Sequence, residues 1–184
     1  LGILANERPD GSRLILETRG KADFEKDQCV RVYGTVQDIT DRKRIENELR
    51  ISEESFRGAF ENAAIGMAII SPEGKWWRVN KSICEITGYT QGELKKLTFA
   101  DITHPEDLQI DLEHLGQLVK GDIQSYQIEK RYFHKAGHIV WVVLAVSIVR
   151  KPDGSPLHFV SQISDITLRK KANIELQNAN RRIQ

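Results

Sequence analysis

Cysteine is scarce in this chain of 184 residues, which has two, Cys29 and Cys84. Two isolated thiols exclude a disulfide framework and a zinc site built on paired cysteines. The sequence therefore favours a reducing, cytoplasmic location. A membrane anchor elsewhere in a longer protein stays open.

Long hydrophobic runs and a surplus of one charge are also missing. The longest mainly apolar run, residues 139–149, is too short to span a bilayer. Lys and Arg number 27 against 26 Asp and Glu, so the chain has no general attraction to polyanions. We expect no nucleic-acid binding and no membrane contact within this segment.

Catalytic motifs are absent as well. The sequence has no Ser/His/Asp order, no glycine-rich loop that would cradle a phosphate and no His/Cys cluster with metal-ligand spacing. We therefore expect no catalytic site and no metal site in this segment.

The chain does contain an internal repeat. The run Asp38-Ile39-Thr40 with Arg42-Lys43 recurs as Asp165-Ile166-Thr167 with Arg169-Lys170, an offset of 127 residues. This spacing is about the size of one modest domain and is too long for a solenoid repeat. The repeat predicts two successive domains that end alike, each followed by a helix.

The part before the first motif is too short to be a domain. Residues 1–40 read as strands and turns, with a turn at Pro9-Asp10-Gly11, and so few strands do not bury a core of their own. Gly11 matches Gly137 at an offset of 126 residues. We expect residues 1–40 to be the C-terminal strands of an upstream domain, so that the chain is a segment of a longer protein.

The remaining boundaries follow from the second copy. Residues 61–167 are predicted to form the complete domain, residues 41–60 a linker helix before it, and residues 168–184 the start of a C-terminal linker helix.

Both predicted linker helices carry a hydrophobic stripe. Ile45, Leu49 and Phe56 follow heptad spacing with one polar position at Ser52, and Leu176 belongs to a similar stripe after the second copy. The stripe fits either an amphipathic helix lying on its own domain or a dimeric coiled-coil connector. About two heptads do not decide between them.

Three long strands are expected at 125–133, 138–149 and 157–166. The run 139–149 is apolar on both alternating faces, which is typical of a strand covered on both sides. One face belongs to the core, and the other needs the linker helix or a partner subunit, although packing within one chain is an alternative. We expect a homodimer through the linker helices and the outer sheet face.

Taken in order, these motifs resemble the PAS family with its C-terminal PAC segment. The resemblance covers about residues 52–170, and its tail half covers residues 1–43; Ala136 stands where the family usually has Asp. The residues that carry it are Gly66, Asn80, Gly88-Tyr89, Glu93-Leu94, His104-Pro105-Glu106-Asp107-Leu108, Gly137, Trp141 and Asp165-Ile166-Thr167 with Arg169-Lys170.

The resemblance implies an α+β fold, in which a five-stranded antiparallel sheet of order 2-1-5-4-3 has short helices on one face, a ligand pocket beneath them and flanking amphipathic linker helices. It also implies a regulatory input, often tandem and dimeric, in bacterial sensor histidine kinases and in enzymes that make or degrade cyclic di-GMP. Adjacent PAS and output domains of the same polypeptide are then the expected partners.

The resemblance further places a signalling junction at Asp165, Ile166 and Thr167, together with Trp141, where the last strand meets the exit helix. The Asp165 carboxylate and the Thr167 hydroxyl suit the N-terminus of a helix. Capping alone also accounts for Asp165.

The implied pocket has apolar candidates that a packed core would use equally well. They are Met67, Ile69, Ile86, Leu112, Leu115 and Ile128.

No cofactor is predicted, and the small-molecule ligand is unknown. Heme-binding relatives present a histidine from the longer helix, but His114 falls about one turn too late and His104 reads as part of a helix start. Flavin photosensors of the family carry a reactive cysteine, which residues 97–102 lack. Cys84 reads as a small buried hydrophobe, and a non-covalent flavin stays open.

Three functional hypotheses result. The leading one is a sensory and relay module of a multidomain signalling protein, acting through the strand–helix junction. The alternatives are a ligand-free dimerisation spacer and a cofactor-bearing (flavin or heme) redox sensor.

Overall fold

The computed structural model describes residues 2–181, except for the side chains of residues 179–181. Residues 182–184 of the predicted C-terminal helix lie outside the described residues. The chain divides into two units, Leu1–Arg57 and Gly58–Gln184.

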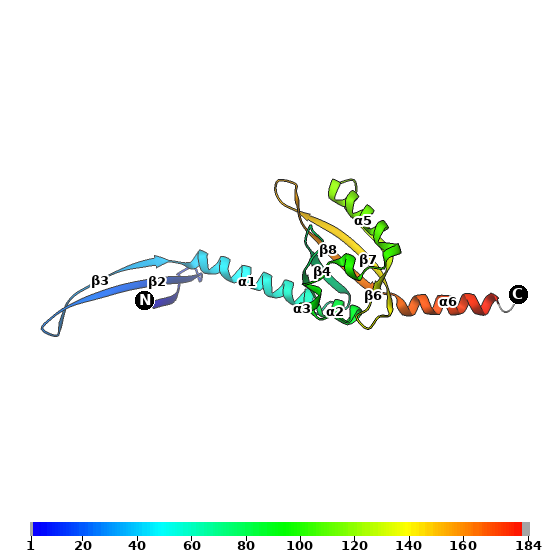
Figure 1. Ribbon diagram of the computed structural model, residues 1–184. Coiled ribbons are helices and arrows are strands. Elements are labelled where there is room, and N and C mark those ends of the chain that lie inside the picture. Colours follow the sequence, from blue (N-terminus) through cyan, green and yellow to red (C-terminus); the bar gives the residue numbers. More distant parts are fainter. Residues whose placement is uncertain (1, 182–184) are drawn as a thin grey trace. The chain divides into compact units, whose positions relative to one another are not determined.

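The first unit is a three-stranded antiparallel sheet followed by a helix (Figure 1). The strands are β1 (Gly2–Glu7), β2 (Arg13–Glu25) and β3 (Gln28–Asp38), and helix α1 spans Thr40–Glu61 and crosses the unit boundary. Lys26 and Asp27 take positive φ in the turn between β2 and β3, as a tight hairpin requires.

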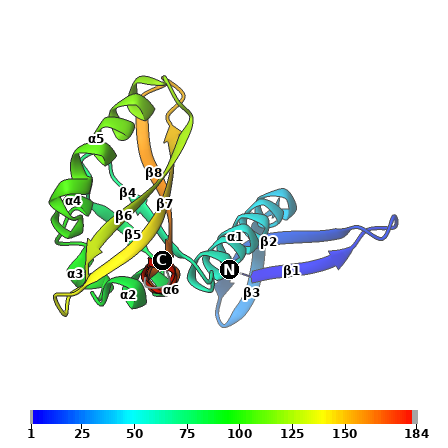
Figure 2. The same cartoon turned by 90° about the vertical axis from the view of Figure 1, so that its right-hand side faces the viewer.

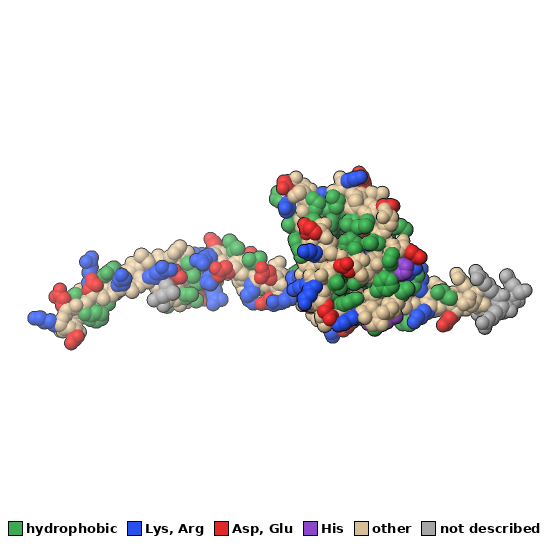
Figure 3. All heavy atoms as spheres, viewed as in Figure 1, with side chains coloured by type: hydrophobic (Ala, Val, Ile, Leu, Met, Phe, Trp, Pro, Cys, Tyr) green, Lys and Arg blue, Asp and Glu red, His purple; other side chains and the backbone are tan. Residues whose placement is uncertain are grey.

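Hydrophobic side chains of this sheet lie at the surface among charged ones (Figure 3). β3 is exposed along its whole length. The exposed large residues on the three strands are Ile3, Leu4, Phe24, Val30, Val32, Tyr33 and Val36. This unit therefore buries little apolar surface of its own.

The second unit contains a five-stranded antiparallel sheet of order β5-β4-β8-β7-β6. Its strands are β4 (Gly66–Ile70), β5 (Trp76–Val79), β6 (Ser125–Phe133), β7 (Ile139–Arg150) and β8 (Pro156–Asp165). Numbered within the unit, the order is 2-1-5-4-3, so the predicted fold class is confirmed.

Four helices lie on one face of this sheet (Figure 2). They are α2 (Lys81–Thr87), α3 (Gln91–Leu94), α4 (Phe99–Ile102) and α5 (Pro105–Lys120), and helix α6 (Thr167–Arg181) follows β8. Asn80 caps α2 at its N-terminus, and Gly88 ends the helix with φ of 75°.

Asn80 also fixes the chain that leads into the sheet. Its Nδ2 donates to the carbonyl oxygens of Phe60 (3.0 Å) and Ile65 (2.9 Å), and its Oδ1 accepts from the Met67 amide at 2.9 Å. One buried amide therefore ties the end of α1, the start of β4 and the start of α2 together within the second unit.

The repeat seen in the sequence is also a repeat of strand register. In the first unit Leu16 pairs with Asp38 and Ala5 with Ile15; in the second Val142 pairs with Asp165 and Arg131 with Trp141. Strands β1, β2 and β3 therefore correspond to β6, β7 and β8.

Two predicted faces need correction. β4 buries Ala68 and Ile70, so Met67 and Ile69 lie on the opposite face of the sheet. The sequence of β4 is apolar at nearly every position. Such a sequence does not indicate which of its alternating side chains face the core.

Helix α5 is rotated from the face predicted by its leucines. It buries Asp111 and Leu118, whereas Leu112 (43% exposed) and Val119 face outward. The buried aspartate occupies the position that the apolar pattern assigned to Leu112, because a buried lysine opposite holds it there.

Candidate functional site

The four predicted junction residues meet at the end of β8. The Thr167 amide donates to the Asp165 carboxylate at 2.7 Å, and the Thr167 hydroxyl accepts from the Trp141 amide at 3.0 Å. The Ile166 amide donates to the Trp141 carbonyl at 2.8 Å, and Ile166 itself is buried. Side chains and backbone thus bond the first turn of α6 to β7 as well as to β8, and we call this arrangement the second joint.

The first unit contains the same arrangement, which we call the first joint. The Thr40 amide donates to Asp38 (2.9 Å), the Ile15 amide donates to the Thr40 hydroxyl (2.9 Å), and the Ile39 amide donates to the Ile15 carbonyl (2.9 Å). Ile39 is buried like its counterpart. The chain builds one strand–helix connection twice, with Ile15 in the place of Trp141.

The second joint has a further set of charged contacts. Glu129 of β6 pairs with Arg169 at 2.7 Å and with Lys170 at 2.5 Å, and the Lys170 ammonium lies 4.8 Å from the centre of the Trp141 ring. Hydrogen bonds from Lys170 and then the nearby cations lower the pKa of Glu129. Sequence reasoning missed Glu129, since a lone acid on a strand gives no signal of its partner.

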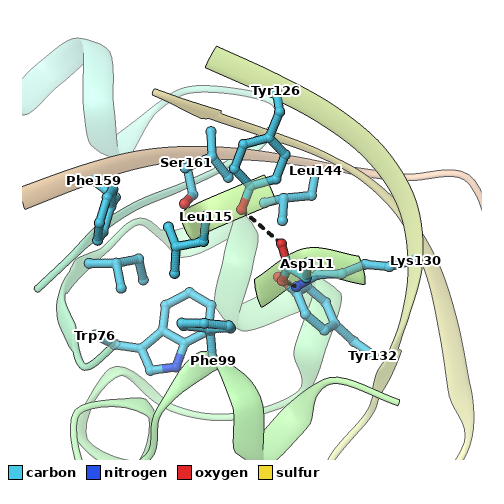
Figure 4. Close-up of a pocket in the computed structure, with 12 residues that line it drawn as sticks. Trp76, Phe99, Asp111, Leu115, Tyr126, Lys130, Tyr132, Leu144, Phe159 and Ser161 are labelled. Atoms are coloured by element: carbon cyan, nitrogen blue, oxygen red, sulfur yellow. Dashed lines mark hydrogen bonds and ion pairs between the residues drawn. The ribbon is translucent and has the colours of Figure 1, made fainter. Parts of the chain in front are cut away.

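A small cavity lies between the helices and the sheet (Figure 4). Its volume is about 20 Å³, enough for one water molecule. The residues that line it are Ile70, Trp76, Phe99, Asp111, Leu115, Tyr126, Lys130, Tyr132, Leu144, Val146, Phe159 and Ser161.

The polar side of this cavity is a buried ion pair. The Lys130 ammonium lies 2.5 Å from the Asp111 carboxylate, and both side chains are almost fully buried, 1% and 2% exposed. Lys130 also donates to the Thr103 hydroxyl at 3.2 Å and lies 4.7 Å from the centre of the Tyr132 ring. The positive charge is therefore compensated inside the protein.

Tyr126 completes the group by donating its hydroxyl hydrogen to Asp111 at 2.8 Å (Figure 4). Burial, and then the neighbouring Asp111 charge, raises the pKa of Tyr126. The tyrosine therefore remains a neutral donor, and Asp111 accepts hydrogen bonds from both Tyr126 and Lys130.

Of the six residues predicted to line the pocket, Leu115 does so. Ile86 and Ile128 pack against the core from its edge, Met67 and Ile69 lie on the other sheet face, and Leu112 is exposed. Sequence reasoning missed Lys130 and Asp111, because charged residues are rarely fully buried unless they are paired.

The histidines considered as ligands have other contacts. His104 caps α5 by accepting from the Glu106 amide at 3.3 Å. His114 makes a hydrogen bond to the carbonyl of Ile110 within α5 and packs on Tyr126. Among the described residues, no group of three or more His, Cys, Asp or Glu is arranged to hold a metal ion.

The hydrophobic stripes of the linker helices lie at the surface. Ile45, Leu49 and Phe56 of α1 are 60%, 59% and 49% exposed, and Leu176 of α6 is exposed as well. Within residues 2–181, no helix is both long and apolar enough to cross a membrane.

Comparison with known proteins agrees with this architecture. A family model described as "PAS fold" matches residues 77–163. The probable diguanylate cyclase DgcE of Escherichia coli (strain K12) is 49% identical over 120 residues, which are 65% of this chain and 11% of that protein. The sensor histidine kinase TmoS of Ectopseudomonas mendocina is 28% identical over 137 residues, 73% of this chain and 14% of that protein.

Solved structures show the same fold. The crystal structure of a PAS domain from Colwellia psychrerythraea superposes with a TM-score of 0.58 at 18% identity, covering 62% of this chain and 96% of that one. This chain spans only 11% and 14% of the two curated relatives above, so it is similar to one segment of each. The second unit, which holds the matched residues 77–163, belongs to the PAS family and is a sensory signalling domain.

Proposed function

We propose that this chain is a relay segment of a multidomain bacterial signal-transduction protein, and that the second joint passes movement of the PAS sheet to the exit helix α6. The observation that carries the proposal is the bonding of Thr167 to Trp141 and Asp165. A displacement of β7 or β8 acts directly on the first turn of α6, because both strands hold that turn.

The output we propose is synthesis of cyclic di-GMP. The 49% identity to a segment of a probable diguanylate cyclase supports this choice over a histidine kinase, for which the identity is 28%. The PAS unit itself is regulatory, and any catalysis belongs to another domain of the parent protein.

The first unit is proposed to be the last part of a second domain of the same fold. Its register and its joint support this, since both reproduce those of β6, β7 and β8. Its exposed strands are then covered by the front half of that domain. We propose residues 1–40, 41–60, 61–167 and 168–184 as the four segments of the chain.

The core of the PAS unit supports relay without a resident metabolite. A cavity of about 20 Å³ does not hold a flavin or a heme unless its aromatic walls, Trp76, Phe99 and Phe159, move apart. The filled core therefore favours the relay and spacer hypotheses over the cofactor-bearing sensor.

We also propose that the segment works as a homodimer. The exposed stripe of α1, Ile45, Leu49 and Phe56, supports a helix-to-helix contact. The outer sheet face supports a second contact, because Trp141, Val143 and Ala145 are only half-buried there.

The experiment that tests the relay is a pair of variants in the full-length protein. Asp165→Ala removes the carboxylate of the second joint, and the expected result is a changed rate of cyclic di-GMP synthesis. Asp153→Ala is the matched control, because Asp153 accepts from the amide two residues later in the same way (2.9 Å) but lies in a turn. Equal activity in both variants and the parent would contradict the proposal.

A further inference from the structure

We infer that three consecutive residues of β6, Glu129, Lys130 and Arg131, couple the position of helix α5 to the direction of the exit helix α6. We call them the β6 triad. The inference deepens the proposed relay and rests on it for its biological meaning, but its geometry is tested separately.

The first member holds α6. Glu129 pairs with Arg169 and with Lys170 at 2.7 Å and 2.5 Å. These are contacts between the edge strand and the first turn of the exit helix, on the side of the sheet away from the cavity. They add a third strand to β7 and β8 as a support of α6.

The second member reaches into the core. Lys130 pairs with Asp111 in the middle of α5, and neighbouring side chains on a strand point to opposite faces. A shift of α5 that moves Asp111 must therefore carry Lys130 with it or leave two buried charges apart, which is strongly unfavourable.

The third member holds the start of α5. The Arg131 guanidinium pairs with Asp107 at 2.7 Å and Glu106 at 2.8 Å, and the Arg131 backbone amide donates to Asp107 at 2.8 Å. The carbonyl of Arg131 also accepts from the His104 amide at 2.9 Å. Two charged contacts and the backbone thus fix the N-terminal end of α5 to this one residue.

The ring of Trp141 lies between Arg131, which holds α5, and Lys170 of α6. The Arg131 guanidinium carbon is 5.3 Å from its ring centre, and the Lys170 ammonium is 4.8 Å from it. Cations favour the face of an indole ring. The residue whose backbone forms the second joint therefore contacts one cation held by α5 and one cation of α6.

The position of β6 at the edge of the sheet allows this strand to move together with α5. Among the described strands, β6 is an edge strand that pairs with β7, and its further backbone contact is with the segment before α5, where Tyr132 bridges Thr103. It can shift with α5 without breaking a second ladder of backbone hydrogen bonds. All three contacts of the triad with helices then move together.

The test measures the direction of α6 by electron spin resonance distances in the whole chain of residues 1–184. Spin labels are placed at Lys151→Cys and Glu175→Cys, both exposed, with Cys29→Ser and Cys84→Ala removing the native thiols. Dilution with unlabelled chain removes distances between subunits. The parent is expected to give one narrow distribution.

Glu129→Gln should broaden that distribution, since α6 loses its contact with β6. The decisive variant is Asp107→Asn, because Asp107 bonds to Arg131 and its loss should broaden the distribution as well. Arg131→Lys, which keeps the charge and loses the forked geometry, gives the same test if Asp107→Asn unfolds. Glu46→Gln is the control, because Glu46 pairs with Arg42 and Lys43 inside α1 and not with the PAS unit.

Reversal of the charges provides the rescue. Glu129→Lys with Arg169→Glu and Lys170→Glu should narrow the distribution again. An unchanged distribution in Glu129→Gln overturns the inference, and so does broadening by Glu129→Gln alone with Asp107→Asn and Arg131→Lys unchanged. A failed relay assay with the expected distances would reject the proposed function and leave the coupling in place.

Discussion

The two strand–helix joints of this chain have the same backbone bonds and different surroundings. Register places Ile3, Leu4 and Ala5 of β1 where the second unit has Glu129, Lys130 and Arg131. The first Asp–Ile–Thr connection therefore forms without charged side chains at these three positions of β1, although Arg8 pairs with Asp38 at 2.9 Å. The β6 triad is an addition specific to the second unit. The comparison separates what makes the joint from what connects it to the helices.

The Arg-Lys pair that follows each joint binds an acidic residue in a different place in the two units. In the first unit, the side chains of Arg42 and Lys43 pair with the Glu46 carboxylate of their own helix, at 3.1 and 2.8 Å. The residue of α6 at the position of Glu46 is Asn173, so Arg169 and Lys170 have no such acid on α6 and pair with the sheet instead. One acidic residue, on helix α1 or on strand β6, therefore decides whether the basic pair binds its own helix or the sheet.

The largest expected effect on stability comes from replacing Lys130, the central residue of the β6 triad, with an apolar residue like the one at this position in the first unit. Lys130→Met leaves the Asp111 carboxylate buried without its cation, and we expect a loss of about 3–5 kcal/mol in the free energy of unfolding of the PAS unit. Urea unfolding followed by tryptophan fluorescence measures this unit alone, because Trp76, Trp77 and Trp141 all belong to it.

The control replaces both partners. Lys130→Met with Asp111→Leu removes the unpaired charge and should recover most of the loss, since apolar pairs of similar volume often replace buried ion pairs without penalty. A single variant that costs less than about 1 kcal/mol would show that Asp111 does not depend on Lys130.

A smaller effect is expected from the joints themselves. Thr167→Val deprives the Trp141 amide of its acceptor, which should lower the free energy of local opening there by about 1–3 kcal/mol. Hydrogen exchange of the Trp141 amide measures it. Thr40→Val is the matched change, and it should accelerate the Ile15 amide less, because the first unit buries little surface and opens more readily. Equal acceleration at both amides would contradict the distinction.

The smallest effect concerns pH. Burial and the neighbouring His138 lower the pKa of His134, which follows β6 and stacks on that residue. A lowered histidine pKa means that the unfolded chain takes up the proton first, so stability of the PAS unit is lost as pH falls below about 6.5.

His134→Gln should therefore reduce the loss of PAS-unit stability between pH 7.5 and 5.5, measured by the same fluorescence assay. The first unit has Arg8 at the corresponding position, so this dependence is confined to the second unit. An equal loss in the variant and the parent would exclude His134 as its source.

The order and type of the helices and strands could be predicted from the sequence. Which face of a strand or helix is buried could not. The five-stranded order was implied by the resemblance to the PAS family, and the repeat in the sequence indicated two successive domains that end alike. The phase of β4 was wrong because an all-apolar strand looks the same from both faces.

Long-range charge pairs were the other gap. Asp111 and Lys130 lie on α5 and β6, and each alone resembles an ordinary surface residue. Their pairing turns Asp111 of α5 toward the core, and Leu112, which was predicted to line the pocket, is exposed. Glu129 was missed for the same reason, since its partners come 40 residues later.

The start of β4 and the end of β8 lie side by side, with Gly66 opposite Ile163. The polypeptide therefore enters and leaves the PAS unit at neighbouring points. Domains with adjacent termini are readily inserted, deleted or duplicated during evolution, because the flanking helices need not be moved apart. The Asp–Ile–Thr ending, which occurs at residues 38–40 and again at residues 165–167, fits such modules placed one after another in a chain.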